Sequence, residues 1–152
     1  MKNLGLVWWL LFCFAASCTG FFVSTDGWYE ELHKPAWNPP TYLFGPVWST
    51  LYVLMAIAAW LVWREGGWKV QGWRLRVFVL QWVLNVCWTP LFFALHKRGA
   101  SFVEICLLWA AIVLTIWAFW GVRRLASVLL IPYLGWVSFA AALNYSIWRL
   151  NM

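Results

Sequence analysis

Long apolar runs with almost no charge constrain this chain more than any other feature of its sequence. Only 11% of its 152 residues are charged, whereas 64% are hydrophobic and 16 residues are tryptophan. A soluble domain of this length usually has about a quarter of its residues charged, because its surface faces water. The composition therefore predicts a membrane protein whose outer surface faces lipid.

Five of these runs have about the length of a membrane span. A hydrocarbon core of about 30 Å requires roughly 20 apolar residues in a helix. The runs lack the alternation of polar and apolar residues that barrel strands require, so we predict helices. The expected spans cover residues 4–23, 42–63, 75–95, 101–122 and 126–148. Because the connections are short, the predicted fold is a single all-α integral membrane domain over residues 1–152, a bundle of five transmembrane helices.

The first run also resembles a secretory signal with a lipoprotein-type cleavage site at Cys18. The apolar run continues past Cys18 to Val23, which favours an uncleaved first helix. All four cysteines fall inside expected spans, where they act as small apolar residues rather than as disulfide or metal partners. We therefore predict no metal site.

Lys and Arg residues are distributed unequally between the two sides of the predicted bundle. The N-terminus with the second and fourth loops holds seven of them, and the opposite side holds four. The positive-inside tendency then predicts a cytoplasmic N-terminus in a bacterial-type cell membrane. The net charge of +6 would also suit nucleic acid, but the cations lie in short clusters between apolar runs. They therefore predict contact with membrane lipids and no nucleic-acid partner. The seven are Lys2, Arg64, Lys69, Arg74, Arg76, Arg123 and Arg124, and the four are Lys34, Lys97, Arg98 and Arg149.

The connection between the first two expected spans, residues 24–41, is the longest and carries three of the five acidic residues. Pro35, Pro39 and Pro40 fix its backbone and prevent a regular helix. We expect a rigid, aromatic-lined cap over one mouth of the bundle. The alternative is an aromatic belt at the membrane interface, where Trp and Tyr are enriched.

Three motifs along the chain resemble a known family. The first begins at Trp28 and reads WYEELHKPAWNPP, the second begins at Asn85 and reads NVCWTPLFF, and the third begins at Pro132 with PYLGW and continues to LNY at Tyr145. They resemble the motifs of the tryptophan-rich sensory protein and translocator protein family, also called the TspO/MBR or peripheral-type benzodiazepine receptor family. The resemblance extends from Trp28 to Asn151.

The resemblance implies a five-helix bundle, often a homodimer, with a ligand cavity beneath the first loop. The expected function is that of a membrane receptor or sensor for porphyrins such as protoporphyrin, and for sterols and isoquinoline or benzodiazepine-type drugs. The alternatives are a light-dependent porphyrin-degrading enzyme that uses the same cavity, or a porphyrin or lipid transporter. No obligatory cofactor is implied, because porphyrin is the ligand or the substrate. The sequence contains no conventional catalytic motif.

Two groups of residues also suggest a cavity by their spacing. Trp136, Ala140 and Asn144 follow one another at intervals of four, so they share one face of a helix. This face could line a flat cavity, or it could serve ordinary helix packing. Asn85 and Trp88 lie one turn apart just before a proline, where the amide could bind a ligand or bridge two helices at a kink.

The resemblance also implies which residues form the site. Trp48 and Trp136 match the family's pocket tryptophans, which are the catalytic candidates if the chemistry is photochemical. Leu143, Tyr145 and Arg149 match a proposed cholesterol-recognition motif, a pattern that recurs by chance in membrane proteins. The expected ligand-binding residues are Tyr29, Pro39, Phe44, Trp48, Tyr52, Asn85, Trp88, Trp136, Ala140, Leu143 and Asn144.

Glu104 is the one carboxylate inside an expected span. An acid within a membrane span suggests a functional role. Because Lys97 and Arg98 are close in sequence, we favour a position at the level of the lipid headgroups.

Overall fold

The computed structural model describes residues 2–22 and 27–152, and every regular element in them is a helix. The five main helices are α1 (Lys2–Phe14), α4 (Phe44–Trp63), α5 (Gly67–Thr89), α6 (Arg98–Trp120) and α8 (Ile131–Leu150). The shorter helices are α2 (Cys18–Phe22), which continues α1 through a 3-10 turn at Ala15–Ser17, α3 (Trp28–Glu31) and α7 (Arg124–Leu129).

Four helical segments of the described chain are long and apolar enough to cross a membrane. They are Thr41–Trp63, Gly67–Ala94, Arg98–Trp120 and Arg124–Leu150, and a shorter apolar helix covers Leu4–Gly20. These segments confirm the predicted all-α fold with five helices in one membrane bundle. The chain is an integral membrane protein that crosses the bilayer several times.

Two spans differ in detail from the expected boundaries. The third begins at Gly67 rather than at residue 75, because the basic residues before residue 75 extend the helix instead of forming a loop. Arg74 donates to the carbonyl of Ala118 at 3.2 Å, so its charge is accommodated against α6. The last span is divided into α7 and α8, and Pro132 stands in the first turn of α8, where its missing N–H is tolerated. Residues 23–26, at the end of the first expected span and the start of the loop, lie outside the described residues.

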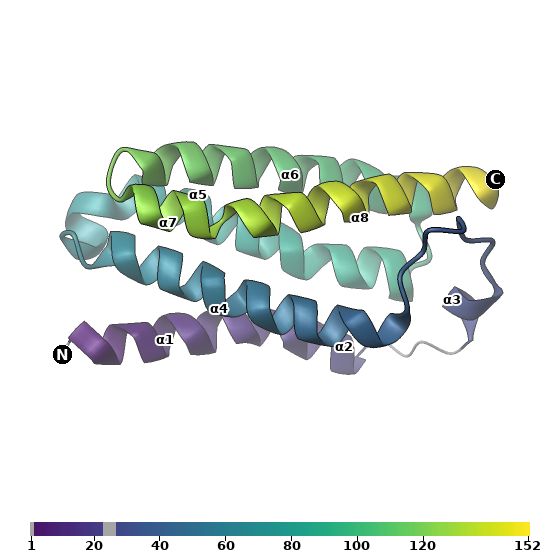
Figure 1. Cartoon of the computed structure of the whole chain (residues 1–152), viewed down its shortest axis with the longest axis horizontal. Coiled ribbons are helices and arrows are strands. Elements are labelled where there is room, and N and C mark those ends of the chain that lie inside the picture. Colours follow the sequence, from purple (N-terminus) through teal and green to yellow (C-terminus); the bar gives the residue numbers. More distant parts are fainter. Residues whose placement is uncertain (1, 23–26) are drawn as a thin grey trace.

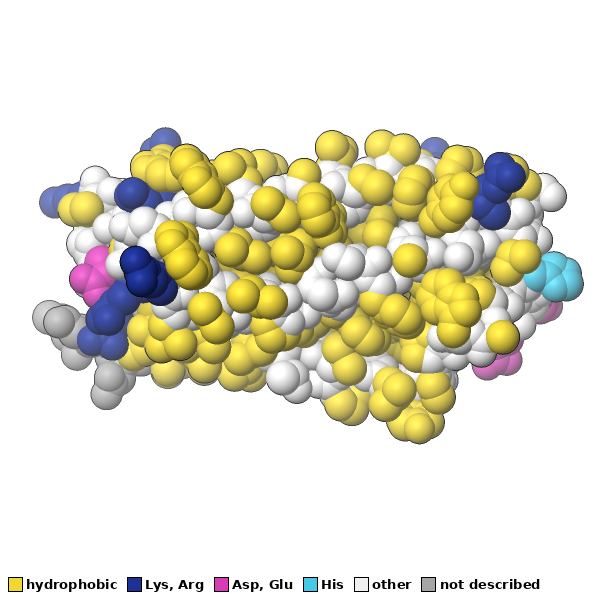
Figure 2. All heavy atoms as spheres, turned by 45° about the horizontal axis from the view of Figure 1, so that its top comes forward, with side chains coloured by type: hydrophobic (Ala, Val, Ile, Leu, Met, Phe, Trp, Pro, Cys, Tyr) yellow, Lys and Arg dark blue, Asp and Glu magenta, His cyan; other side chains and the backbone are white. Residues whose placement is uncertain are grey.

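The helices lie lengthwise beside one another (Figure 1). The N-terminus, the α4–α5 turn and α7 lie at one end of the bundle, and the C-terminus and α3 lie at the other. Helix α1 packs along α4, and α6 packs against both α5 and α8. Figure 2 shows apolar side chains along the length of the molecule, with charged side chains mainly at its two ends. This distribution is that of a protein whose sides face hydrocarbon.

Small residues allow the closest helix contacts. Ala56, Ala58 and Ala59 of α4 are completely buried, and Gly5 of α1 lies against the ring of Trp63. Without a hydrophobic driving force between helices in lipid, such close approach provides the van der Waals contact that holds them together. The second half of α4 is therefore tightly packed against its neighbours.

We call residues 27–41 the cap, and the end of the bundle that holds the C-terminus and α3 the cap-side end. Hydrogen bonds and apolar contacts fix the cap to this end. Asn151 bonds the backbone of His33 twice, since its Oδ1 accepts from the His33 N–H at 3.0 Å and its Nδ2 donates to the His33 carbonyl at 2.8 Å. Tyr29 is buried against Phe92 and donates to Asn38 Oδ1 at 3.0 Å. Burial raises the pKa of Tyr29 above its ordinary value, which keeps this hydroxyl protonated as a donor.

Gly5 provides a test of the close packing. A methyl group at this position would overlap the ring of Trp63, so we expect Gly5→Ala to destabilise the bundle by about 1–3 kcal/mol. The matched control is Gly72→Ala, because a Cβ at Gly72 meets nothing within 4 Å. Thermal unfolding in detergent should show a lower Tm for Gly5→Ala and an equal or higher Tm for Gly72→Ala. Equal Tm values for the two variants would contradict the close contact.

Candidate ligand-binding cavity

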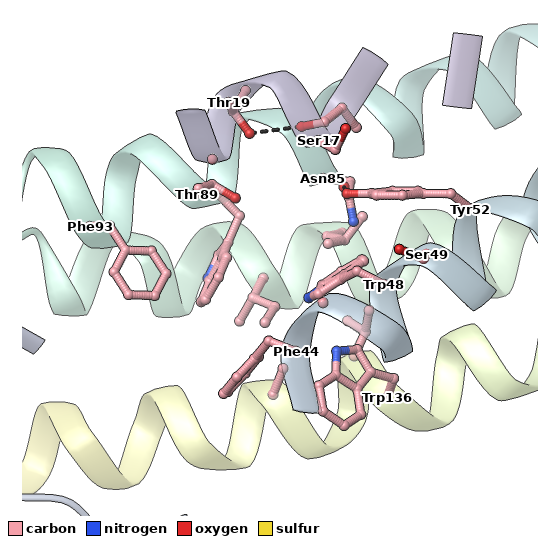
Figure 3. Close-up of a pocket in the computed structure, with 18 residues that line it drawn as sticks. Ser17, Thr19, Phe44, Trp48, Ser49, Tyr52, Asn85, Thr89, Phe93 and Trp136 are labelled. Atoms are coloured by element: carbon pink, nitrogen blue, oxygen red, sulfur yellow. Dashed lines mark hydrogen bonds between the residues drawn. The ribbon is translucent and has the colours of Figure 1, made fainter. Parts of the chain in front are cut away.

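A cavity of about 370 Å³ lies inside the cap-side half of the bundle. Helices α4, α5, α6 and α8 contribute to its wall, and the segment around α2 closes one side (Figure 3). Its lining residues are Ala16, Ser17, Thr19, Gly20, Phe44, Gly45, Trp48, Ser49, Tyr52, Asn85, Trp88, Thr89, Phe93, Ile105, Leu108, Trp136, Val137 and Ala140.

Helix α4 supplies one aromatic wall of the cavity. Pro39 and Pro40 end the cap, and a 3-10 turn at Thr41–Leu43 then leads directly into α4. Phe44, Trp48 and Tyr52 follow at intervals of four residues, so they share one face of the helix. Figure 3 shows all three side chains beside the cavity.

Helices α5 and α8 supply the facing walls. The α5 helix ends at Thr89, and the chain continues through one π-helical turn at Pro90–Ala94, since proline cannot provide the N–H of a regular α-helix. Phe93 of this turn reaches the cavity. On α8, the ring of Trp136 lies edge-on to Phe44, with the ring centroids 5.9 Å apart.

A chain of hydrogen bonds forms the inner end of the cavity and joins three helices. Tyr52 donates to Asn85 Oδ1 at 3.4 Å, and Asn85 Nδ2 donates to the Tyr133 hydroxyl at 3.1 Å. Tyr133 in turn donates to Gln81 Oε1 at 2.8 Å. Asn85 thus bridges helices and also lines the cavity, so both roles considered for this amide are compatible with its position.

Several polar groups of the cavity wall have no partner among the described residues. The indole Nε1 of Trp136 is buried without a hydrogen bond, and the hydroxyls of Ser49 and Thr89 make none either. Ser17 and Thr19, in contrast, already donate to backbone carbonyls. The cavity therefore combines aromatic walls with two hydroxyl groups, those of Ser49 and Thr89, that could donate to a ligand oxygen or nitrogen, whereas the Trp136 N–H is buried within the protein.

The structure brings seven of the predicted ligand-binding residues together on this wall. They are Phe44, Trp48, Tyr52, Asn85, Trp88, Trp136 and Ala140. Their binding role stays a prediction.

Four predicted residues do not line the cavity. Tyr29 and Leu143 belong to a second apolar cluster beneath the cap, together with Phe92. Pro39 lies in the cap. Asn144 accepts a hydrogen bond from Trp88 Nε1 at 3.2 Å and donates one to the carbonyl of Arg98 at 3.0 Å. It therefore positions Trp88 without lining the cavity itself.

The residues of the sterol motif face different surroundings. Leu143 is buried, whereas Tyr145 is 45% exposed and packs on the outside of the bundle against Phe102. Arg149 is exposed near the end of α8. The three side chains therefore do not form one continuous surface.

Glu104, which we expected at the headgroup level, has a buried side chain on α6. It is 8% exposed, and neither carboxylate oxygen has a hydrogen-bond partner among the described residues. Its neighbours in sequence Ile105 and Leu108 reach the cavity wall, but Glu104 does not.

The cavity residues that we did not predict are mostly small, hydroxyl-bearing or aliphatic. Ala16 and Gly20 on the first span lie four residues apart, and Gly45 and Ser49 repeat this spacing on α4. Small residues at this spacing are the signal that could have indicated a helix face left open for a ligand. We did not predict these small residues as part of a cavity, because the same spacing also occurs where two helices are in direct contact.

Comparison with known proteins agrees with the resemblance of the motifs. Residues 7–149 match the model of the TspO/MBR family. The chain is 44% identical to the tryptophan-rich protein TspO of Chlorobaculum tepidum, over 91% of this chain and 90% of that protein. It is 41% identical to the translocator protein of Homo sapiens, over 91% of this chain and 83% of that protein. It is 36% identical to the tryptophan-rich sensory protein of Cereibacter sphaeroides, over 95% and 92% of the two chains. This membrane protein belongs to the TspO/MBR family.

Proposed function

We propose that this chain is a membrane receptor or sensor that binds porphyrins and related flat hydrophobic ligands, including sterols and isoquinoline or benzodiazepine-type molecules, in the cap-side cavity. The observation that carries the proposal is the enclosure of about 370 Å³ by aromatic side chains of α4, α5 and α8. Cavities of about 300–1,000 Å³ with apolar walls and few polar groups are typical of small-molecule sites. The names of two relatives, a sensory protein and a translocator protein, agree with a role in sensing or moving such a molecule.

The chemistry of the wall favours a flat aromatic ligand over a flexible chain. Indole rings attract other π systems in offset or edge-on geometry, in addition to the apolar area that they bury. The hydroxyls of Ser49 and Thr89 on the cavity wall offer donors to a carboxylate or carbonyl of the ligand. A porphyrin with propionate side chains has both a large flat ring and such acceptors.

The first test is a titration with protoporphyrin in the dark, followed by the quenching of tryptophan fluorescence in detergent. Since each tryptophan contributes about 0.5–1.5 kcal/mol beyond its buried area, Trp48→Phe and Trp136→Phe should raise the Kd by about two- to tenfold. The control is Trp117→Phe, because this side chain is 67% exposed on the outer face of α6. The proposal fails if quenching does not saturate, or if the control weakens binding as much as the cavity variants do.

The second test changes the volume of the cavity. Ala140 lines the cavity, so the side chain of Ala140→Leu should occupy ligand space and raise the Kd for protoporphyrin by about tenfold or more. Ala142 lies two residues further along α8 and lines an outer groove against α6 instead. Ala142→Leu should therefore bind as the wild type does. Equal losses in the two variants would point to a general disturbance of α8.

Light-dependent breakdown of the bound porphyrin is a second candidate function, and two ring contacts of Trp48 favour it. The ring of Trp48 lies 5.6 Å from that of Tyr52 and 6.3 Å from that of Tyr133, measured between centroids. Oxidisable side chains thus continue from the cavity wall into the bundle. In this hypothesis light excites the porphyrin, and the excited ring accepts one electron from Trp48 or Trp136. Dioxygen is the oxidant that then adds to the ring, so that carbon atoms of the ring are oxidised while dioxygen is reduced.

Illumination of the saturated complex in air separates the two functions. If the chain degrades porphyrin, the absorption of the bound porphyrin should decrease while new product bands appear, and Trp48→Phe should slow the change several-fold. The same sample kept in the dark or without dioxygen is the control. Stable absorption of the illuminated wild-type complex would leave the receptor function and exclude the enzyme.

The remaining expectations concern assembly and membrane. From the family resemblance we propose a homodimer, and from the distribution of Lys and Arg a cytoplasmic N-terminus in a bacterial-type cell membrane. Seven of the eleven cations belong to the N-terminus and to the second and fourth loops, or to the helices that adjoin them. Both statements stay predictions.

A further inference from the structure

A second hollow lies near the opposite end of the bundle, far from the cap. It has a volume of about 520 Å³ and lies on the side of the bundle where α1, the end of α4 and the start of α5 meet. We call it the aromatic cleft. Its lining residues are Leu4, Gly5, Trp8, Trp9, Phe12, Trp63, Trp68 and Val79.

Stacked rings give the aromatic cleft rigid walls. Trp9 stacks on Trp68 with the ring centroids 6.3 Å apart, and Phe12 stacks on Trp82 at 4.3 Å. Gly72 follows Trp68 by four residues and precedes Val79 by seven, so it shares a face of α5 with these two lining residues, and a Cβ there would meet nothing within 4 Å. The cleft is thus a preformed surface of the size of an acyl-chain segment, and the described residues that line it are aliphatic or aromatic apart from Gly5.

Two cations of α5 lie close in sequence to residues that line the aromatic cleft. Lys69 directly follows Trp68, and Arg76 lies four residues after Gly72 and three before Val79, on the same side of α5. Both side chains are exposed, and neither has a hydrogen-bond or ion-pair partner among the described residues.

Other cations at this end of the bundle have partners. Arg74 donates to Gln71 and to the carbonyl of Ala118. Arg123 pairs with Glu65 at 3.0 Å, so the carboxylate nearest to this end is already neutralised. Lys69 and Arg76 therefore leave a local excess of positive charge beside the aromatic cleft.

The position of Arg76 along α5 makes an anion especially favourable. Arg76 is nine residues beyond the helix start at Gly67, which places it about 14 Å along the axis of an apolar membrane span. An exposed cation at this depth is costly in hydrocarbon, and its long side chain must extend back toward the phosphate level. A bound phosphate would neutralise it there.

We propose that the aromatic cleft binds an anionic phospholipid. One acyl chain lies against the rings of Trp8 and Trp68, and the phosphate is held by Lys69 and Arg76. A zwitterionic lipid would bring an ammonium group to a region whose one described carboxylate, Glu65, already pairs with Arg123. The site is distinct from the cap-side cavity and does not depend on the function proposed for it.

Native mass spectrometry of the detergent-purified protein tests the proposal with two probes of identical acyl chains, palmitoyl-oleoyl phosphatidylglycerol and palmitoyl-oleoyl phosphatidylcholine. The wild type should bind phosphatidylglycerol more tightly. The double variant Lys69→Gln/Arg76→Gln should lose about fivefold in affinity for this lipid per cation removed, and its preference should disappear.

The matched control, Lys97→Gln/Arg124→Gln, removes the same charge from two exposed residues outside the aromatic cleft. It should keep the preference for phosphatidylglycerol. Equal losses in the two double variants would show a general effect of net charge and overturn the site, and so would an unchanged preference in Lys69→Gln/Arg76→Gln.

A third variant tests the apolar part of the site. Gly72→Leu places a side chain on the face of α5 that carries Trp68 and Val79, and leucine is a better helix former than glycine, so the fold should be kept. Occupancy by the first phosphatidylglycerol molecule should fall several-fold, although all charges are retained. Unchanged occupancy would show that no acyl chain lies in the aromatic cleft.

Discussion

The chain of hydrogen bonds from Tyr52 through Asn85 and Tyr133 to Gln81 fixes the centre of this bundle. Hydrocarbon offers no water to a buried amide or hydroxyl, so these groups must find one another. Their bonds join α4, α5 and α8 in one relative position, at distances of 2.8–3.4 Å. Because Tyr52 and Asn85 also form the inner end of the cavity, the same contacts that hold the helices together define where a ligand can lie. In the proposed function, binding and stability are thus coupled through these side chains.

The cavity lies at the cap side because the side chains of α4 that face its neighbours are large in the first half of the helix and small in the second. Its first half carries Phe44 and Trp48, whose rings keep the neighbouring helices apart. Its second half carries Ala56 and Ala59, which are completely buried and let the neighbouring helices approach closely. The large rings of the first half thus border the cavity, and the small side chains of the second half lie in the packed core. A single helix, α4, therefore borders the cavity with its first half and packs in the core with its second half.

The motifs and the spacing of the sequence predicted most aromatic residues of the cavity wall, Phe44, Trp48 and Tyr52 through the family resemblance, but not its small residues. Membrane spans follow from apolar runs of about 20 residues, and tryptophans at helical spacing stand out against an aliphatic background. Ser49 and Thr89 carry no such signal, because a small hydroxyl residue is equally common at a plain helix contact. Hydropathy also placed the start of the third span too late, since it cannot show that Arg74 finds a carbonyl on α6. Hydropathy also could not show that Glu104 is buried, because the exposed fraction of a side chain depends on which face of the helix it occupies.

The tryptophans of this chain lie in three different surroundings. The polar groups next to each ring decide which kind of molecule the ring can contact. In the cavity, the rings face inward from several helices, beside the hydroxyls of Ser49 and Thr89. At the opposite end, Trp8 and Trp68 face the side of the bundle, with Lys69 and Arg76 next to them. Under the cap, Trp28 stacks on His96 at 4.0 Å and closes the end of the bundle. An inward ring beside a hydroxyl donor suits an enclosed ligand that carries an acceptor, whereas an outward ring beside an unpaired cation suits a molecule with an apolar chain and an anionic head. A single residue type can therefore line two sites of different chemistry in one small bundle.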